Sequence, residues 1–336
     1  MIVEAIRKIV DQKDLTKEEA GAVMSEIMTG KTTDAQIGAF ITALRMKGET
    51  ADEITGLAKV MRDQATRIAP EADEMIDTCG TGGDAPDTFN ISTASAFVAA
   101  GAGVHVAKHG NRSVSSQCGS ADVLQELGVN IELSPKQVED CIDQVGIGFL
   151  FAPALHKAMK YAIGPRREIG IRTVFNILGP LCNPAFAAAQ VLGVYSQELT
   201  LVMAKALGDL GTKHALVVHG AGGMDEISNT GKSKIAEFSN GELIEYEITP
   251  EQFGLARCRM DDLQGGGQDT CAKILKDVLA GTGGPRRDIV LLNSAAALIA
   301  AGKAVNFEDG IKLASESIDS GAALGKLEEL IEYSNR

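Results

Sequence analysis

The sequence predicts an α/β protein in which a small N-terminal helical domain precedes a larger domain with a mainly parallel sheet flanked by helices. Three observations support this prediction. Residues 1–72 carry only helix patterns, apolar strand-like segments alternate with helical segments from Met75 onward, and the C-terminal part is helical again. Such alternation is typical of parallel strands covered by helices. We expect the helical domain over residues 1–72 and the α/β domain in the remainder of the chain.

The N-terminal domain is predicted to contain four short helices. The apolar residues Ile2, Ile6, Ile9 and Val10 lie on one face of the first. Three capping boxes predict where the other three helices begin. In each box, the threonine and the acid or amide three residues later accept hydrogen bonds from N–H groups at the start of the helix that have no partner within it. Four short helices bury little surface alone, so we expect them to pack on the rest of the chain or on another subunit. The boxes are Thr16-x-x-Glu19, Thr33-x-x-Gln36 and Thr50-x-x-Glu53, and Gly30 and Gly48 stand where the first two of these helices should end.

The α/β domain is predicted to contain six apolar strands and one hairpin. The hairpin is expected over residues 236–245, around Asn240-Gly241, so one antiparallel pair should lie at a sheet edge. The strand candidates are Met75–Thr78, Val104–Lys108, Val129–Leu133, Gly148–Phe151, Ala189–Tyr195 and His214–His219.

Helices are expected between the strands and at the C-terminus. Ser134-Pro135-Lys136-Gln137 is a capping box with proline at the first helical position. The segment Gly164–Pro184 is predicted to be helical in its middle, with a Gly-Pro pair ending the helix on each side. Near the C-terminus, Ile289, Leu292, Ala296 and Ile299 have helical apolar spacing.

Composition and charge exclude several classes of protein. The net charge of −13 argues against nucleic-acid binding, which needs clustered Lys and Arg. We expect no membrane contact, since no apolar run approaches about 18 residues, and the start at Met1 has no signal-peptide pattern. The six cysteines show no CxxC pair or zinc spacing, so reduced thiols and a cytoplasmic location are expected.

A glycine-rich turn after the first predicted strand is the strongest functional feature. Gly80, Gly82 and Gly83 are followed by Asp84, and glycine lets backbone N–H groups approach a bulky anion closely. Ser92 and Thr93 then open a small-residue helix whose N-terminus would add donors and a positive dipole end. Together these features predict a phosphate cradle, although a purely structural tight turn stays possible from this segment alone.

Two better-known glycine motifs fit this segment less well. Residues 80–85 formally match the relaxed dinucleotide fingerprint, but Pro86 interrupts it and residues 101–109 contain no carboxylate for a ribose. A Walker A motif is excluded because no Gly-Lys-Ser/Thr follows.

Four loops that carry glycine, charged or histidine residues follow predicted strands. In parallel sheets, ligands bind beyond the carboxyl ends of the strands. Because four independent segments agree, we expect them to form one site: Gly80–Asp84, His109–Arg112, Pro153–His156 and Gly220–Glu226.

The residue types in these loops indicate an anionic ligand, because cations gather locally in this acidic chain: Lys108, His109 and Arg112 in one loop, and Arg166, Arg167 and Arg172 in another. Lys108, Arg112 and the serines at 113–116 and 120 could surround a phosphate or diphosphate, or the serines could be ordinary turn residues and Ser120 a helix N-cap. Asp225-Glu226 could hold Mg²⁺ together with phosphate oxygens, or be solvated. Among Arg166, Arg167 and Arg172, one could grip a carboxylate, or all could make structural pairs.

Taken together, these motifs resemble those of the anthranilate phosphoribosyltransferase family. The resemblance spans nearly the whole chain, with one departure at Cys271, where asparagine is more usual in the family and which lies outside the motifs. The matching segments are Asp77–Asp84, Asn90–Thr93, Lys108–Ser116, Gly119–Asp122, Arg166–Thr173, Asn176–Pro184 and Asp225-Glu226.

The resemblance implies a pentosyltransferase. It would join anthranilate to 5-phosphoribosyl 1-diphosphate (PRPP), release diphosphate and form N-(5-phosphoribosyl)anthranilate in tryptophan biosynthesis. The resemblance also implies a homodimer formed through the helical part. It further implies that about residues 165–184 complete the helical domain, which leaves residues 73–164 and 185–336 to the PRPP-binding α/β domain.

Site roles are implied by the same resemblance. Mg²⁺ would be held by Ser92, Asp225 and Glu226, and anthranilate would contact Gly80, Asn111, His156 and Arg166. PRPP would be held by Gly80, Gly82, Gly83, Asp84, Thr88, Asn90, Ile91, Ser92, Thr93, Lys108, His109, Gly110, Asn111, Arg112, Ser113, Val114, Ser115, Ser116 and Ser120.

The chemistry predicts no essential catalytic base. Departure of diphosphate from the anomeric carbon should pass through an oxocarbenium-like state, and an aromatic amine is already neutral at pH 7. Positioning and stabilisation of the leaving group should therefore dominate. Two alternatives are a pyrimidine-nucleoside phosphorylase, for which a longer chain would be expected, and a non-catalytic relative that binds polyanions, against which the negative charge argues.

Overall fold

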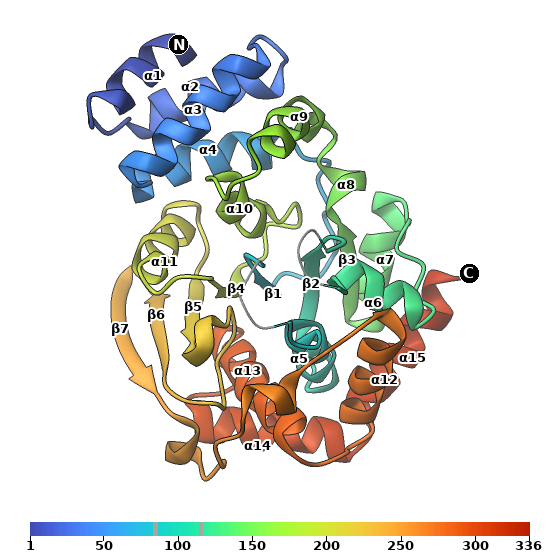
Figure 1. The fold of residues 1–336 in the computed structure, drawn as a ribbon. Coiled ribbons are helices and arrows are strands. Elements are labelled where there is room, and N and C mark those ends of the chain that lie inside the picture. The colour runs from blue at the N-terminus through green and yellow to red at the C-terminus, as the bar shows by residue number, and fades with distance from the viewer. Residues whose placement is uncertain (83–86, 114–116) are drawn as a thin grey trace.

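The computed structural model of the chain describes residues 1–82, 87–113 and 117–336 (Figure 1). Its N-terminal part is a bundle of short helices, as predicted, and the capping boxes are confirmed at three helix starts. Gly48 follows the third helix with a φ of 91°, and Gly30 follows the second with a φ of 69°. Both are left-handed conformations that glycine tolerates at helix ends. The helices are α1 (Ile2–Val10), α2 (Lys17–Met28), α3 (Asp34–Lys47) and α4 (Ala51–Gln64).

The larger domain contains a seven-stranded sheet with the order β3-β2-β1-β4-β5-β6-β7. The first five strands along the chain pair in parallel, whereas β6 runs antiparallel to both β5 and β7. The predicted mainly parallel sheet and its edge hairpin are therefore confirmed. The strands are β1 (Met75–Gly80), β2 (His105–Gly110), β3 (Ile147–Phe151), β4 (Ala189–Gly193), β5 (His214–Gly220), β6 (Ser233–Ser239) and β7 (Glu242–Ile248).

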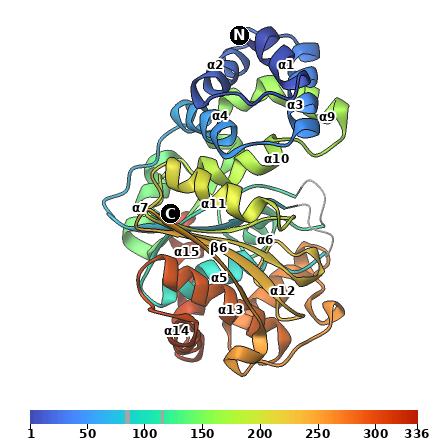
Figure 2. The same ribbon diagram turned by 90° about the vertical axis from the view of Figure 1, so that its left-hand side faces the viewer.

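Helices cover both faces of the sheet, as Figure 2 shows from the side. Consecutive strand residues such as Val191 and Leu192 belong to different apolar cores, because successive side chains of a strand point to opposite faces of the sheet. One core lies under α5 (Ile91–Gly101), α12 (Gln268–Leu279), α13 (Pro285–Ala300), α14 (Phe307–Asp319) and α15 (Ala322–Ser334). The other faces α11 (Leu199–Asp209). A smaller third core joins α7 (Pro135–Val145) and α8 (Ala152–Leu155) to β2 and β3, whereas α6 (Ser120–Glu126) packs into the first core.

The second core continues without a break into the N-terminal bundle. Residues from α1 to α4, from α9 (Lys160–Ile169) and α10 (Phe175–Leu178), and from β4 and β5 all belong to it. The short helices therefore bury their apolar faces against later parts of the chain, which supplies the surface that they lack alone. The domain boundaries, including the assignment of residues 165–184 to the helical domain, stay a prediction.

Two sequence predictions about local structure are wrong. Residues 129–133 are not a strand, because Val129 and Ile131 are buried in the core that includes α15, and the Asn130 N–H donates to Ser334 Oγ at 3.1 Å. Packing on the C-terminal helix thus replaces strand pairing. Gly164-Pro165 does not end a helix but lies inside α9, where Pro165 is buried together with the apolar face.

Within the described ranges, no helix has both the length and the apolar character needed to cross a membrane.

Candidate active site

Three neighbouring parallel strands end on glycine, and these glycines make room for an acidic loop. They are Gly80 of β1, Gly193 of β4 and Gly220 of β5. A Cβ on Gly193 would overlap the carbonyl oxygen of Asp225, and a Cβ on Gly80 would lie 2.8 Å from the Asp225 Cγ. The loop that carries Asp225 and Glu226 therefore rests directly on the carboxyl ends of the strands, where the sequence predicted a site.

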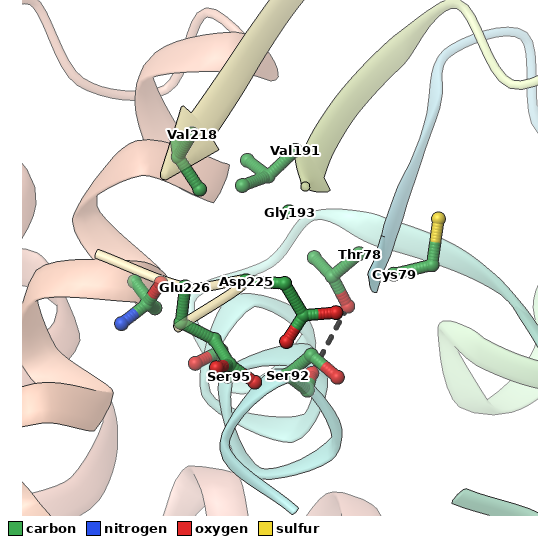
Figure 3. A pocket seen from close by; sticks show the side chains of 10 residues that line it. Thr78, Cys79, Ser92, Ser95, Val191, Gly193, Val218, Asp225 and Glu226 are labelled. Atoms are coloured by element: carbon green, nitrogen blue, oxygen red, sulfur yellow. Dashed lines mark hydrogen bonds between the residues drawn. The ribbon is translucent and has the colours of Figure 1, made fainter. Parts of the chain in front are cut away.

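A small cavity lies between this loop and the first turns of α5 (Figure 3). Asp225 Oδ2 accepts the Gly82 N–H at 2.8 Å, which ties the acidic loop to the glycine turn. Thr78 Oγ1 donates to the Ser92 carbonyl at 3.0 Å and fixes the start of α5 against β1. The cavity is lined by Thr78, Cys79, Ser92, Ser95, Val191, Gly193, Val218, Asp225, Glu226 and Asn293.

The donor set of this cavity suits a hard divalent cation. Burial raises the pKa of Asp225, while the hydrogen bond from the Gly82 N–H opposes that shift. Two carboxylates that are close together and shielded from water repel each other, and a cation bound between them removes that repulsion. Carboxylate and hydroxyl oxygens are the ligands that Mg²⁺ prefers. Asp225, Glu226 and Ser92 therefore fit the magnesium site that the sequence indicated.

Lys108 and His109 do not form one cluster of cations with Arg112, contrary to the sequence interpretation. Lys108 and His109 are neighbours in β2, so their side chains point to opposite faces of the sheet. Lys108 Nζ donates to the Thr78 carbonyl at 2.6 Å and lies 3.4 Å from Ser92 Oγ, beside the cavity. Burial lowers the pKa of Lys108.

His109 instead pairs with His156 on the other face of the sheet. Their Nε2 atoms are 3.1 Å apart. Burial lowers the pKa of His109 to about 3 and that of His156 to about 4. Both rings are therefore neutral at pH 7, and in the pair one nitrogen donates and the other accepts.

The loop after β2 is held together by Asp122. Its carboxylate accepts the N–H groups of Ser113 at 3.0 Å and Gly119 at 2.9 Å, and pairs with Arg112 Nη1 at 2.9 Å. Gly119, not Ser120, is the N-cap of α6, and Ser120 Oγ donates to the Asn111 carbonyl at 3.3 Å. The Arg112 guanidinium is thus engaged within the loop.

The remaining predicted PRPP contacts lie around the start of α5 and the end of β2. Thr88 forms a backbone bridge with Gln264, and Asn90 Nδ2 donates to the Cys118 carbonyl at 3.1 Å. The side chains of Ile91 and Thr93 are buried. Gly110 lies against the Ser120 hydroxyl. The predicted residues Gly83, Asp84, Val114, Ser115 and Ser116 lie outside the described part of the chain.

Arg166 differs from its neighbour Arg167 in its surroundings. Its guanidinium lies 5.1 Å from the centre of the Phe175 ring and is half-buried, which lowers its pKa, whereas Arg167 is exposed. In the described residues, Arg166 forms no ion pair with a carboxylate. The structure brings His156 into contact with His109, while Arg166 contacts Phe175 instead of either histidine.

Asn293 is a residue that sequence reasoning missed. It is buried on α13, where its Oδ1 accepts the Ile227 N–H at 2.9 Å and its Nδ2 donates to the carbonyls of Ile227 and Ile289, both at 2.8 Å. It therefore fixes the backbone next to Glu226. The sequence did contain a signal, since Asn293-Ser294 is the only polar pair in the otherwise apolar stretch of α13 from residue 289 to residue 300.

Comparison with known proteins finds matches over nearly the whole chain. Residues 72–324 match the family described as "Glycosyl transferase family, a/b domain", and residues 3–65 match "Glycosyl transferase family, helical bundle domain". The anthranilate phosphoribosyltransferase of Acetivibrio thermocellus is 57% identical over 335 residues, covering 100% of this chain and 97% of that protein. That of Pelobacter propionicus is 57% identical over 346 residues, covering 99% of each.

Solved structures agree with the sequence relatives. The crystal structure of the Thermus thermophilus anthranilate phosphoribosyltransferase has a TM-score of 0.94 at 41% identity and covers 99% of both chains. The Saccharomyces cerevisiae enzyme in complex with PRPP and Mg has a TM-score of 0.89 at 30% identity, covering 99% of this chain and 98% of that one. With the glycine turn, the acidic pair and the helical bundle in place, this chain belongs to the anthranilate phosphoribosyltransferase family.

Proposed function

We propose that this chain transfers the 5-phosphoribosyl group of PRPP to the amine of anthranilate, the second step of tryptophan biosynthesis from chorismate. The observation that carries the proposal is the acidic pair Asp225-Glu226, which rests on three strand-end glycines and faces the first turns of α5. This arrangement sets carboxylates, hydroxyls and backbone N–H groups around one point at the end of a parallel sheet. The similarity to an enzyme whose structure contains PRPP and Mg supports it.

The donor half of the site would hold the diphosphate. Mg²⁺ held by Ser92, Asp225 and Glu226 would neutralise charge on the departing diphosphate. The N–H groups of the first turn of α5 would donate to phosphate oxygens, whereas the Gly82 N–H already donates to Asp225. Lys108 would add positive charge beside Ser92, from which its Nζ lies 3.4 Å. The other PRPP-binding assignments drawn from the family resemblance stay part of this proposal.

The acceptor half of the site would hold anthranilate by its carboxylate. Arg166 is the better candidate for this contact than Arg167, because its half-buried guanidinium is fixed over Phe175 while Arg167 is exposed. Gly80, Asn111 and His156 would line the same half. The His109–His156 pair is a weak base toward the amine, because the pKa of His109 is about 3 and that of His156 about 4, in agreement with a mechanism of positioning and leaving-group stabilisation.

Replacing Arg166 with alanine is expected to raise the KM for anthranilate by about 10- to 100-fold, with a much smaller change in kcat. A charge-assisted hydrogen bond is worth about 1.5–3 kcal/mol, which corresponds to that range. Steady-state kinetics with anthranilate as the varied substrate would measure the effect. Arg167→Ala is the matched control and should stay within about twofold of the parent, as surface substitutions usually do. A fall in kcat at unchanged KM would contradict the assigned role.

We also propose a homodimer formed through the helical part. Several apolar side chains of this part are exposed, which is typical of an interaction surface when they gather on one face. They include Val3, Val10, Met46, Ile163 and Ile171. A cytoplasmic location is part of the proposal and is supported by the six cysteines, all of which are free thiols.

The direct test follows the fluorescence of anthranilate. Consumption is expected only when PRPP and Mg²⁺ are both present, and EDTA should abolish it. Full activity in EDTA would overturn the metal assignment. Phosphorolysis of thymidine with inorganic phosphate would favour a nucleoside phosphorylase instead, and a salt-sensitive DNA gel shift without turnover would favour a polyanion-binding protein.

A further inference from the structure

Ser95 carries a buried hydroxyl that the proposed roles leave unexplained. It lies one turn beyond Ser92 on α5, so both side chains lie on the same face of that helix. Both line the cavity beneath Asp225 and Glu226, as Figure 3 shows. Ser95 is 1% exposed, and its Oγ is among the buried side-chain oxygens that have no hydrogen-bond partner within the described ranges.

An unpartnered hydroxyl at this depth is costly. Leaving a buried polar group without a hydrogen bond costs the desolvation of that group without compensation. Serine inside a helix can relieve this cost by donating to a carbonyl of the preceding turn, which Ser95 does not do. Two of the polar groups that line the cavity are held by other residues, since the Asn293 amide binds Ile227 and Ile289, and Asp225 Oδ2 accepts from Gly82. Since Ser95 lines the cavity, a molecule or ion held there can supply the missing partner.

We propose that Ser95 is a further binding residue of this cavity, whose hydroxyl hydrogen-bonds a water molecule on the divalent cation held by Ser92, Asp225 and Glu226. This inference rests on the metal site of the proposed function. Mg²⁺ usually keeps several of its waters, so a protein site for it includes partners for those waters. Side chains one helical turn apart have Cβ atoms about 5–6 Å apart, whereas Mg²⁺ ligands lie at about 2.1 Å from the ion. If Ser92 is a direct ligand of the ion, Ser95 lies too far away to be a second one, and a water bound to the ion spans the distance to the Ser95 hydroxyl.

The hydrogen-bonding capacity of a hydroxyl matches this role. Serine has one donor and two acceptor lone pairs. A water whose oxygen is bound to a cation acts as a donor, so Ser95 Oγ accepts from it. The Ser95 proton is then left for a carboxylate oxygen or a second water in the cavity.

Ser95→Ala tests the inference through metal binding and stability rather than turnover. Binding of Mn²⁺ alone would be followed by the electron paramagnetic resonance signal of the free ion, and unfolding by calorimetry without metal. We expect the Mn²⁺ Kd to rise about tenfold, as for loss of one hydrogen bond. Without metal, the variant should unfold at the same or a higher temperature than the parent, because an unpartnered buried hydroxyl has been removed.

Ser294→Ala is the matched control. Ser294 is fully buried on α13, and its hydroxyl also has no partner in the described residues, but it does not line the cavity. Its removal should leave the Mn²⁺ Kd unchanged. An equal rise in Kd for both variants would overturn the inference, since the effect would then not be local.

Asp225→Asn separates failure of the inference from failure of the metal site. If Asp225→Asn weakens Mn²⁺ binding and Ser95→Ala does not, the role of Ser95 is overturned while the metal site stands. If the parent does not bind Mn²⁺, or if Asp225→Asn binds it as the parent does, the metal site is overturned together with the inference.

Discussion

Gly193→Ala is expected to destabilise the protein strongly and to slow its turnover. The new Cβ would overlap the Asp225 carbonyl oxygen, and it would also lie 3.1 Å from the Asp225 Cα. Because both atoms are backbone, the acidic loop would have to move as a whole. Overpacking of this kind costs about 3 kcal/mol, and a shift of the loop by about 1 Å could reduce kcat about 100-fold. Urea unfolding and initial rates would measure the two effects.

Gly325→Ala is the control for this substitution. Gly325 lies inside α15 and a Cβ there would meet no atom within 4 Å. Alanine is favoured over glycine in a helix interior by up to about 1 kcal/mol, so this variant should be slightly more stable and fully active. If Gly193→Ala matched the parent in both stability and rate, the acidic loop would not rest on the strand ends.

Replacing Asp225 and Glu226 together by alanine is expected to reduce kcat by about 1,000-fold or more. A bound metal ion supplies several kcal/mol of charge stabilisation, and about 1.4 kcal/mol corresponds to a factor of ten. The KM for anthranilate should change little, because that substrate is proposed to bind through Arg166. Steady-state kinetics with each substrate varied in turn, over a range of Mg²⁺ concentrations, would separate these parameters.

An adjacent acidic pair elsewhere serves as the control. Glu328 and Glu329 are exposed on α15, so the double alanine variant there removes the same charge without touching the cavity. It should retain full turnover. A raised anthranilate KM at unchanged kcat in the Asp225-Glu226 variant would reverse the assignment of donor and acceptor roles.

Local signals in the sequence predicted local structure well. The capping boxes and Gly48 depend on residues within one turn, so they were recognised without knowledge of the fold. Residues 129–133 were mistaken for a strand because their apolar pattern does not show which element they pack on, and that element is the C-terminal helix.

The site was predicted only in part, because local sequence does not show which distant parts of the chain come into contact. The glycine turn and Asp225-Glu226 follow strands, and the parallel arrangement brings them together at one edge. Lys108 and His109 were grouped with Arg112 by sequence proximity, although strand alternation separates the first two. Gly193 and Asn293 gain their importance from contacts with loop residues distant in the chain.

The core shared between the N-terminal helices and α9 and α10 has a consequence for synthesis of the protein on the ribosome. Helices α1 to α4 are complete by Gln64, but α10 ends at Leu178, so their partners emerge roughly a hundred residues later. At about 5–20 residues per second, the nascent helices wait for at least several seconds with the apolar surface that later packs on α9 and α10 uncovered. During that interval they are natural clients for a chaperone at the exit tunnel.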